Sequence, residues 1–376
     1  MKTPIGQFPE PKLIDSNYLE TLNRVRNNYQ TATDHYPGNN DPESFQLDQL
    51  AYEREMLVDD INFMGKQNLL AFADNKWLDN AGALVDCERL KPTASHCPFE
   101  GIFTPNHGGF ELPKGFSVLA KDGKTVFATQ EVFTIPRGEV SRLLTLYCTQ
   151  TGPQANGFRA GDINQISAPL PQVKSLINTT ISVGGSKEES NDNYRERIYL
   201  APSGFSSAGP FEAYEYFARS AHPSISRVKV LSPEPNHIDI YVLLYDEQTP
   251  SQAILDTVEA YCNAQKRRPI GDLVKAMAAE PNQVTTTMHL QIYTDMQSMA
   301  TSTVTTVRNK LDVLTTRWRS QLGRDVVPEA LTAEAQVLQA VYLATTPLAF
   351  KKIASHQFPV VTITDITYEI VDEQTE

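Results

Sequence analysis

Residues 47–64 carry apolar side chains at the spacing of a long helix that packs against another helix. The intervals between these residues alternate between three and four, which is the pattern of a coiled coil or a helical bundle. Arg54 interrupts the pattern, and a charge at such a position costs stability unless a carboxylate meets it. We call this set the helical seam; it consists of Leu47, Leu50, Arg54, Leu57, Ile61 and Met64. Either the first helix of this chain or another subunit would cover the seam, and the sequence leaves both alternatives open.

The whole segment 1–85 is predicted to be a helical arm. Asp15 and Ser16 can cap a first helix, the breaker-rich stretch HYPGNNDPES follows it, and Ser44 can cap the second helix. Acids outnumber bases here, since residues 1–90 hold 8 Lys and Arg against 15 Asp and Glu. These acids form either a solvated helical face or an arm that docks onto basic partners.

The patterns beyond the arm predict a multidomain α+β fold. Residues 86–180 are rich in Pro, Gly and strand-like runs, with KDGK (121–124) as a hairpin turn, and they predict a small β-rich domain. Residues 181–282 and 283–376 each alternate helical and strand-like patterns. They predict two C-terminal α/β sandwich domains in series, the first of them the central domain.

Charge and hydropathy disfavour several classes of partner. The 376 residues have a net charge of −12 and a pI near 5.1, which repels nucleic-acid phosphates and acidic lipid headgroups. No apolar run approaches the roughly 18 residues of a membrane span. We therefore expect no nucleic-acid partner and no membrane insertion. The cysteines follow no paired spacing, which favours folding in a reducing cytoplasm; they are Cys87, Cys97, Cys148 and Cys262.

The stretch SVGGSKEESNDNYRERI (182–198) contains a glycine pair followed by acids and arginines. It lacks the spacing of a dinucleotide-binding or P-loop motif. Ser186 and Glu189 fit the S-x-x-E capping box, so we interpret the stretch as the start of a helix. The candidate structural or interface residues here are Gly184, Gly185, Ser186, Glu189, Tyr194, Arg195 and Arg197.

Two further stretches give candidate structural residues. The stretch GPFEAYEYFARSAH opens with Gly209 and places Pro210 at a first helical position, with Tyr214 on the inward face. The cluster Lys266-Arg267-Arg268 precedes Pro269. It is interpreted either as the basic end of a helix or as a docking point for an acidic surface.

No motif predicts a catalytic, metal or cofactor site. His96 and Cys97 are adjacent, and Cys87 and His107 lie ten residues away, which is not the spacing of a zinc site. GFSSAG (204–209) only loosely resembles a nucleophile elbow. An active site assembled from distant residues at a domain junction remains an alternative.

Five stretches follow one another in a fixed order over residues 68–330. They are NLLAFADNKWLDNAG (68–82), INTTISVGGSKEESNDNYRERI (177–198), SSAGPFEAYEYFARSAHPSISRVKVLSPEPNHIDIYVL (206–243), KRRPIGDLV (266–274) and RSQLGRDVV (319–327). In their joint order and spacing they resemble the baseplate J-like family, the wedge proteins of contractile phage tails and related injection machines.

The resemblance implies a structural protein of the virion tail baseplate, assembled in the host cytoplasm, with no enzymatic activity and no cofactor. It implies that the N-terminal helices join a bundle with a second wedge protein. It further implies that the C-terminal domains form homodimers, which close a ring around the hub and contact the hub and sheath-initiating proteins. Movement of this ring would couple baseplate rearrangement to sheath contraction. Phage, bacteriocin and other injection systems all remain open.

Overall fold

The structure is a computed structural model that describes residues 8–206, 208–245, 248–264, 267–269, 271–337 and 340–372. The chain divides into two compact units. The first contains residues 1–89 and 190–202, and the second contains residues 90–189 and 203–376. Residues 190–202, which the sequence pattern groups with the central domain, thus pack with the N-terminal arm.

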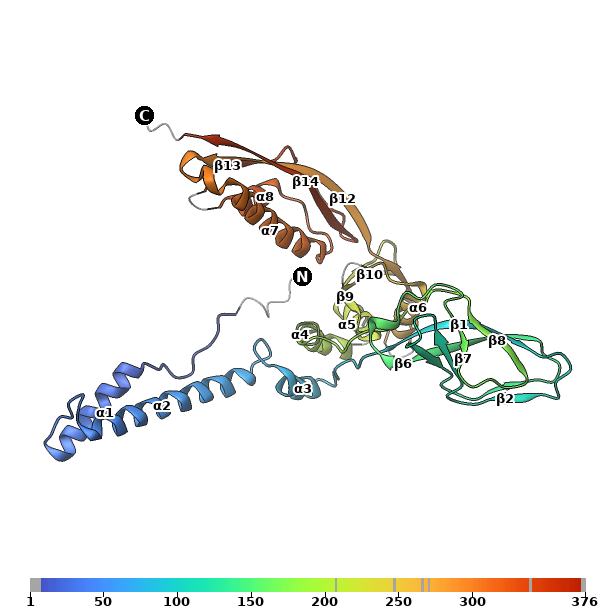
Figure 1. Ribbon diagram of the computed structural model, residues 1–376, viewed down its shortest axis with the longest axis horizontal. Helices are drawn as coiled ribbons and strands as arrows, with labels where there is room; N and C mark the ends of the chain where they lie inside the picture. Colours follow the sequence, from blue (N-terminus) through green and yellow to red (C-terminus); the bar gives the residue numbers. More distant parts are fainter. Residues whose placement is uncertain are drawn as a thin grey trace. The chain divides into compact units, whose positions relative to one another are not determined.

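The first unit is helical and is shown in blue and yellow-green in Figure 1. Helices α1 and α2 lie side by side as a hairpin, and α3 packs against α4. The predicted caps are wrong by a few residues. Asn17 caps α1 by accepting from the Leu19 and Glu20 N–H groups, and α2 begins at Pro42, ahead of Ser44. The helices are α1 (Tyr18–Thr33), α2 (Pro42–Gln67), α3 (Asn75–Ala83) and α4 (Asn191–Leu200).

The second unit begins with a sheet that nearly closes into a barrel. Its strand order is β7-β3-β4-β6-β1-β8, and the two edge strands β7 and β8 contact each other. Strands β2 and β5 form a separate pair. The predicted turn at 121–124 joins β3 to β4. The strands are β1 (Ala94–Phe103), β2 (Phe110–Leu112), β3 (Ser117–Ala120), β4 (Val126–Ala128), β5 (Phe133–Ile135), β6 (Ser141–Thr151), β7 (Ile163–Ile166) and β8 (Val173–Asn178), with a short 3-10 helix η2 (Pro153–Ala155).

A three-stranded sheet with helices against it follows. In the order β11-β10-β9, β10 pairs antiparallel with β9 and parallel with β11. Inward side chains such as Val242 pack against Phe217 of α5 and Val258 of α6. Pro210 is the residue before α5 and not its first helical residue. The elements are η3 (Ala201–Phe205), α5 (Phe211–Ala221), β9 (Ile225–Leu231), β10 (His237–Leu244), α6 (Gln252–Cys262) and β11 (Leu273–Ala278).

The last part repeats this plan with longer strands. The order is β13-β12-β14, and α7 and α8 contribute Leu311, Trp318 and Leu331 to its core. Because β12 starts at Glu280, directly after β11, the chain enters this sheet without a loop. The elements are β12 (Glu280–Tyr293), η5 (Thr294–Met299), α7 (Ala300–Arg319), α8 (Pro328–Ala335), β13 (Val341–Thr345) and β14 (Gln357–Val371). The fold is thus mixed α+β, with an N-terminal helical region, a near-barrel sheet and further sheets.

Candidate functional site

Helix α4 contains the charged half of the stretch 182–198, and its start differs from the prediction. Ser190 is the N-cap and accepts from the Asn193 N–H at 3.3 Å. Ser186 cannot start a helix, because its N–H and C=O exchange hydrogen bonds with Thr93 at 3.2 and 3.1 Å. Glu189 instead accepts from the Leu90 N–H at 3.0 Å. The predicted capping box of Ser186 and Glu189 is therefore wrong.

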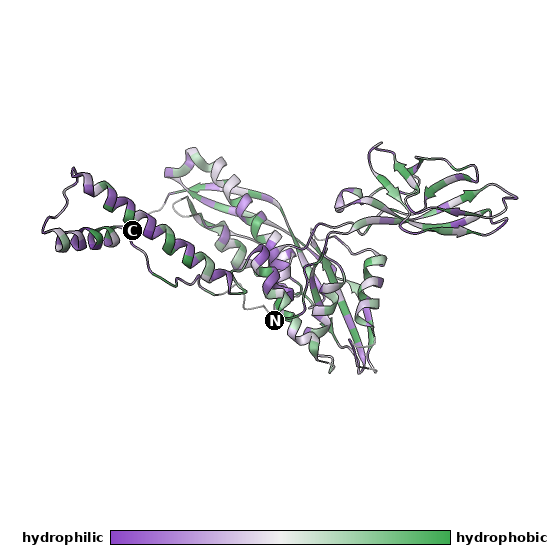
Figure 2. Ribbon diagram, turned by 90° about the horizontal axis from the view of Figure 1, so that it is seen from below, coloured by the Kyte–Doolittle hydropathy of each residue, from purple (hydrophilic) through white to green (hydrophobic). Residues whose placement is uncertain are grey.

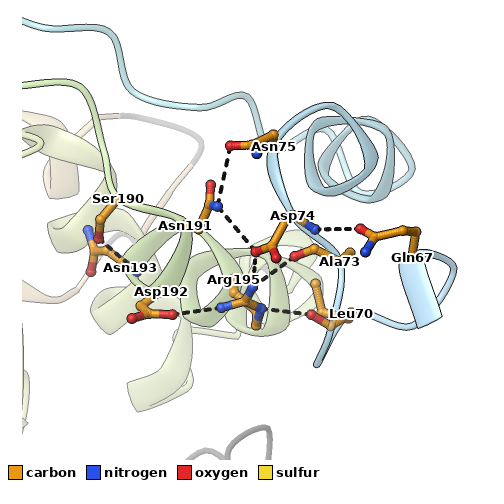
Figure 3. A network of polar contacts seen from close by, with 10 residues as sticks. All are labelled: Gln67, Leu70, Ala73, Asp74, Asn75, Ser190, Asn191, Asp192, Asn193 and Arg195. Carbon is orange, nitrogen blue, oxygen red and sulfur yellow. Dashed lines mark hydrogen bonds and ion pairs between the residues drawn. The ribbon is translucent and has the colours of Figure 1, made fainter. Parts of the chain in front are cut away.

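Arg195 of α4 holds the turn between α2 and α3 (Figure 3). Its Nε donates to the Leu70 carbonyl at 2.9 Å, and its Nη2 donates to the Ala73 carbonyl at 2.8 Å. The same guanidinium forms ion pairs with Asp74 at 3.1 Å and Asp192 at 2.8 Å. A planar guanidinium with five donors suits such a set of acceptors, and a lysine ammonium does not. Arg195 therefore fixes the segment that follows the long helix.

Tyr194 and Arg197 hold the segment after α3. The Tyr194 hydroxyl donates to the Cys87 carbonyl at 2.6 Å, and burial raises the pKa of Tyr194 to about 12. Arg89 and Arg197 lie over the Tyr194 ring, at 4.6 and 5.4 Å from its centroid. Arg197 also donates to the Glu88 carbonyl. Helix α4 thus binds the chain on both sides of α3.

Gly82 is a residue of this contact that the sequence did not reveal. A Cβ built on Gly82 would lie 2.0 Å from the Tyr194 hydroxyl oxygen and 2.4 Å from the Cys87 carbonyl oxygen. Only glycine therefore fits where α3 meets α4. The stretch NLLAFADNKWLDNAG contains this glycine, but nothing in its spacing indicates the partner.

The glycine pair at 184–185 allows close backbone approach inside the second unit. Gly184 has φ +86°, and a Cβ there would lie 2.6 Å from Cε1 of His96. A Cβ on Gly185 would lie 2.3 Å from the Gly152 carbonyl oxygen. The Gly184 carbonyl accepts from the Thr93 hydroxyl at 2.6 Å and from Nε2 of His222 at 3.2 Å. The pair therefore serves local packing within this unit.

The predicted residues of the stretches 209–222 and 266–269 lie close to one another within the second unit. Gly209 has φ +70°, and a Cβ there would lie 2.8 Å from the Pro269 ring. The Tyr214 hydroxyl donates to the Asp272 carboxylate, and burial raises the pKa of Tyr214. Arg268 donates to the Asp272 carbonyl.

The basic cluster makes contacts with the preceding helix. Arg267 donates to the Tyr261 carbonyl in the last turn of α6 at 3.0 Å, and its guanidinium lies 3.5 Å from the centroid of the Tyr261 ring. Lys266 lies outside the described residues. The contacts of Arg267 favour the helix-end interpretation of the cluster over the docking interpretation.

Four of the six residues of the helical seam are exposed on α2 in the part of the chain that the structure describes. The face of α2 toward α1 is formed by the buried Ala51 and Val58 and by Arg54 of the seam. Arg54 reaches across to the Thr21 hydroxyl and pairs with Glu55, both at 2.9 Å, which supplies the expected carboxylate. Four seam residues are 46% to 61% exposed: Leu50, Leu57, Ile61 and Met64. The first helix of this chain, which was one of the two alternatives for covering the seam, therefore does not cover these four residues.

A second apolar stripe runs along α2, and Figure 2 shows apolar residues along the length of this helix. At about 100° per residue, the four exposed seam residues and the second stripe point roughly 130° apart, and they point about 100° and about 130° away from the face formed by Ala51 and Val58. The second stripe consists of Phe45, Tyr52, Met56 and Phe63, which are 45% to 77% exposed. Helix α2 therefore has three apolar faces, and the described residues cover one of them.

The residues considered as metal ligands have other surroundings. His96 stacks on Tyr147 at 5.3 Å, and His107 bonds to the Glu139 carbonyl at 2.8 Å. Burial raises the pKa of Cys97 to about 12. Within the described ranges, no group of three or more His, Cys, Asp or Glu could hold a metal ion. In the same part of the chain, every helix is too short or too polar to cross a membrane.

Three kinds of comparison relate this chain to known proteins. Models of the baseplate J-like N-terminal domain, barrel domain and central domain match residues 40–95, 101–185 and 206–278. Baseplate protein J of Escherichia phage P2 is 32% identical over 166 residues, which is 43% of this chain and 53% of that protein. The alignment thus spans about half the length of this relative. A chain of the cryo-EM structure of the anti-feeding prophage baseplate aligns over 95% of both chains, with 11% identity and a TM-score of 0.39. With its three domain types matched in order along the sequence, the chain belongs to the baseplate J-like family.

Proposed function

We propose that the chain is a structural wedge component of the baseplate of a contractile tail or a related contractile injection system. The support is the ordered match to three baseplate J-like domain models and the similarity to a protein named baseplate protein J. In this proposal the chain acts through assembly and not through catalysis.

The observation that carries the proposal is the pair of exposed apolar stripes on α2. A monomer rarely leaves two contiguous apolar stripes in water along one helix, and such surfaces mark sites of association. Burying a half-exposed Leu, Ile, Met or aromatic side chain contributes about 1 kcal/mol. Eight such side chains on one helix would therefore make a substantial contribution to a helical bundle.

We assign the two stripes to two further helices, because no one helix covers faces that point about 130° apart. One helix would come from a second wedge protein, and the other from a second copy of this chain. The C-terminal sheets would form the homodimer contact that closes the ring around the hub. In the virion tail baseplate, this ring would contact the hub and the sheath-initiating protein and would couple baseplate rearrangement to sheath contraction.

The test uses tail particles purified from the host. Mass spectrometry is expected to find the wild-type chain in these particles. Leu57→Glu places a charge on the seam and should lower incorporation at least tenfold. Asn28→Glu places the same charge on the exposed face of α1 and should leave incorporation unchanged. Particles that assemble without the wild-type chain, or that incorporate both variants equally, would contradict the proposal.

A further inference from the structure

Strand β6 has one edge that is paired with a neighbouring strand and a second edge that is paired over only part of its length. Its first edge pairs with β1, but its second edge pairs with β4 only at Phe127–Cys148 and Ala128–Tyr147. Beyond Ala128 the chain leaves this sheet and forms β5, whose ladder partner is β2. Among the described residues, no strand pairs with the second edge of β6 at residues 141–146.

A groove of about 520 Å³ lies along this open edge. Along β6, Leu143 and Thr145 are exposed while Leu144 points into the core, yet all three line the groove. The groove therefore follows the edge of the strand and not one of its faces. Its full lining is Gln130, Glu131, Phe133, Leu143, Leu144, Thr145 and Tyr147.

The ladder fixes which backbone groups face the groove. His96 of β1 exchanges both of its backbone hydrogen bonds with Val183, at 2.8 and 3.0 Å, so these groups point away from β6. His96 stands opposite Tyr147, and in an antiparallel pair the groups of Tyr147 then point away from β1. Thr145 and Leu143 lie two and four residues before Tyr147 and have the same orientation. Their N–H and C=O groups therefore open into the groove.

Both ends of the groove are closed. At one end Ala128 pairs with Tyr147, and at the other Arg142 donates through Nη1 to the Thr134 carbonyl at 2.6 Å. The open edge between them amounts to Leu143–Thr145. At a rise of about 3.3 Å per residue, it offers space for roughly three residues of added strand.

The side chains of the groove give a chemical preference. Leu143 is 68% exposed and, with Phe133, provides an apolar contact. Glu131 is the one charged residue of the lining, is exposed, and has no ion pair within the described residues. An occupant with Lys or Arg beside Glu131 would supply the complementary charge.

We propose that this groove binds a short extended segment of a partner protein, which adds a strand to the edge of β6 through Leu143 and Thr145. The segment carries an apolar side chain over Leu143 and a basic side chain beside Glu131. Backbone pairing of this kind supplies affinity, while the side-chain contacts supply specificity. We assign a different protein and not a second copy, because this chain has a net charge of −12, and a second acidic chain is a poor source of the basic segment that would complement Glu131. The inference rests on the proposed function, since the partner is another protein of the same assembly.

The test uses particles in which mass spectrometry has already found the chain, so a negative result counts against the groove and leaves the proposed function standing. A photo-cross-linking amino acid at Leu143 should cross-link to a basic extended segment of one other protein. Peptides containing Leu143 and Thr145 should exchange amide hydrogens at least tenfold more slowly in particles than in the isolated chain. A cross-link to a second copy, or exchange that does not slow, would overturn the proposal.

Substitutions separate backbone pairing from side-chain packing. Thr145→Pro removes a groove-facing N–H and keeps the ladder with β1, because the N–H of Thr145 points away from β1. It should reduce the cross-link at least tenfold, whereas Thr145→Val keeps the N–H and should retain the cross-link. Glu131→Lys leaves the strand unchanged and should weaken the cross-link several-fold, which gives a second test if Thr145→Pro does not fold. Equal cross-linking in all variants would overturn the proposal.

Discussion

Nε of Arg195 lies 2.9 Å from the carbonyl oxygen of Leu70, a residue 125 positions earlier in the chain. This hydrogen bond joins the helix α4 to the turn that ends the long helix α2. The chain passes between the two compact units after Arg89, after Glu189 and after Pro202, and α4 is the segment between the last two passages. Arg195 therefore joins two segments of the first unit that lie far apart in the sequence.

Arg195→Ala is expected to loosen the segment 68–89. The substitution leaves the carbonyls of Leu70 and Ala73 without their donor, and an unsatisfied group of this kind costs about 1–3 kcal/mol. Hydrogen exchange over residues 68–89 should become at least tenfold faster. Arg195→Lys should restore only part of the protection, and Arg24→Ala on the exposed face of α1 serves as the control. Unchanged exchange in Arg195→Ala would show that α4 does not hold this segment.

Gly82→Ala is expected to destabilise the first unit by about 1–3 kcal/mol, the usual cost of overpacking. The added Cβ would lie 2.4 Å from the Cys87 carbonyl oxygen, which belongs to the backbone and cannot rotate away. Gly108→Ala is the matched control, because a Cβ there has no atom within 4 Å. Chemical denaturation followed by circular dichroism measures both variants. Equal unfolding midpoints would contradict the proposed fit between α3 and α4.

The sequence predicts those features that depend on local pattern. The seam spacing of Leu50, Leu57 and Ile61 correctly predicts a long helix, and KDGK correctly predicts a hairpin turn. The sequence could not show which face α1 covers. That contact uses the small Ala51 and Val58 with polar links such as Arg54 to Thr21, which no hydrophobic pattern reveals.

Features that depend on distant residues were missed or misplaced. Ser186 fits a capping box by local rules, but its backbone pairs with Thr93 and the helix starts at Asn191. Part of the need for glycine at position 184 comes from His96, and part of the need at position 82 comes from Tyr194. In each case the partner lies more than 85 positions away, so spacing within a motif carries no information about it.

Stability of the second unit is expected to fall as pH decreases below about 6.5. Burial lowers the pKa values of His222 and His96, which lie beside Gly184 and near each other. The Ser224 N–H donates to Nδ1 of His222 at 3.2 Å, which favours the neutral ring in the folded state. The unfolded chain binds a proton at these histidines near pH 6.5 and the folded chain does not, so acid favours unfolding. Thermal unfolding from pH 8 to 5 measures the slope, which should be smaller in His222→Gln. An equal slope in this variant would contradict the assignment to His222.

Tyr214→Phe is expected to destabilise the second unit by about 1–3 kcal/mol, because the buried hydroxyl donates to the Asp272 carboxylate. Asp272→Asn keeps an acceptor at nearly the same place and should cost less. A double-mutant cycle of Tyr214→Phe and Asp272→Ala, which removes the acceptor, should give a coupling energy of about 1 kcal/mol or more, since the residues share one charge-assisted hydrogen bond. Tyr199→Phe, at an exposed position of α4, should be neutral and provides the control. Urea unfolding of the wild type, the two single variants and the double variant gives the coupling energy. Additive effects would show that the contact between α5 and the segment 267–272 does not depend on this bond.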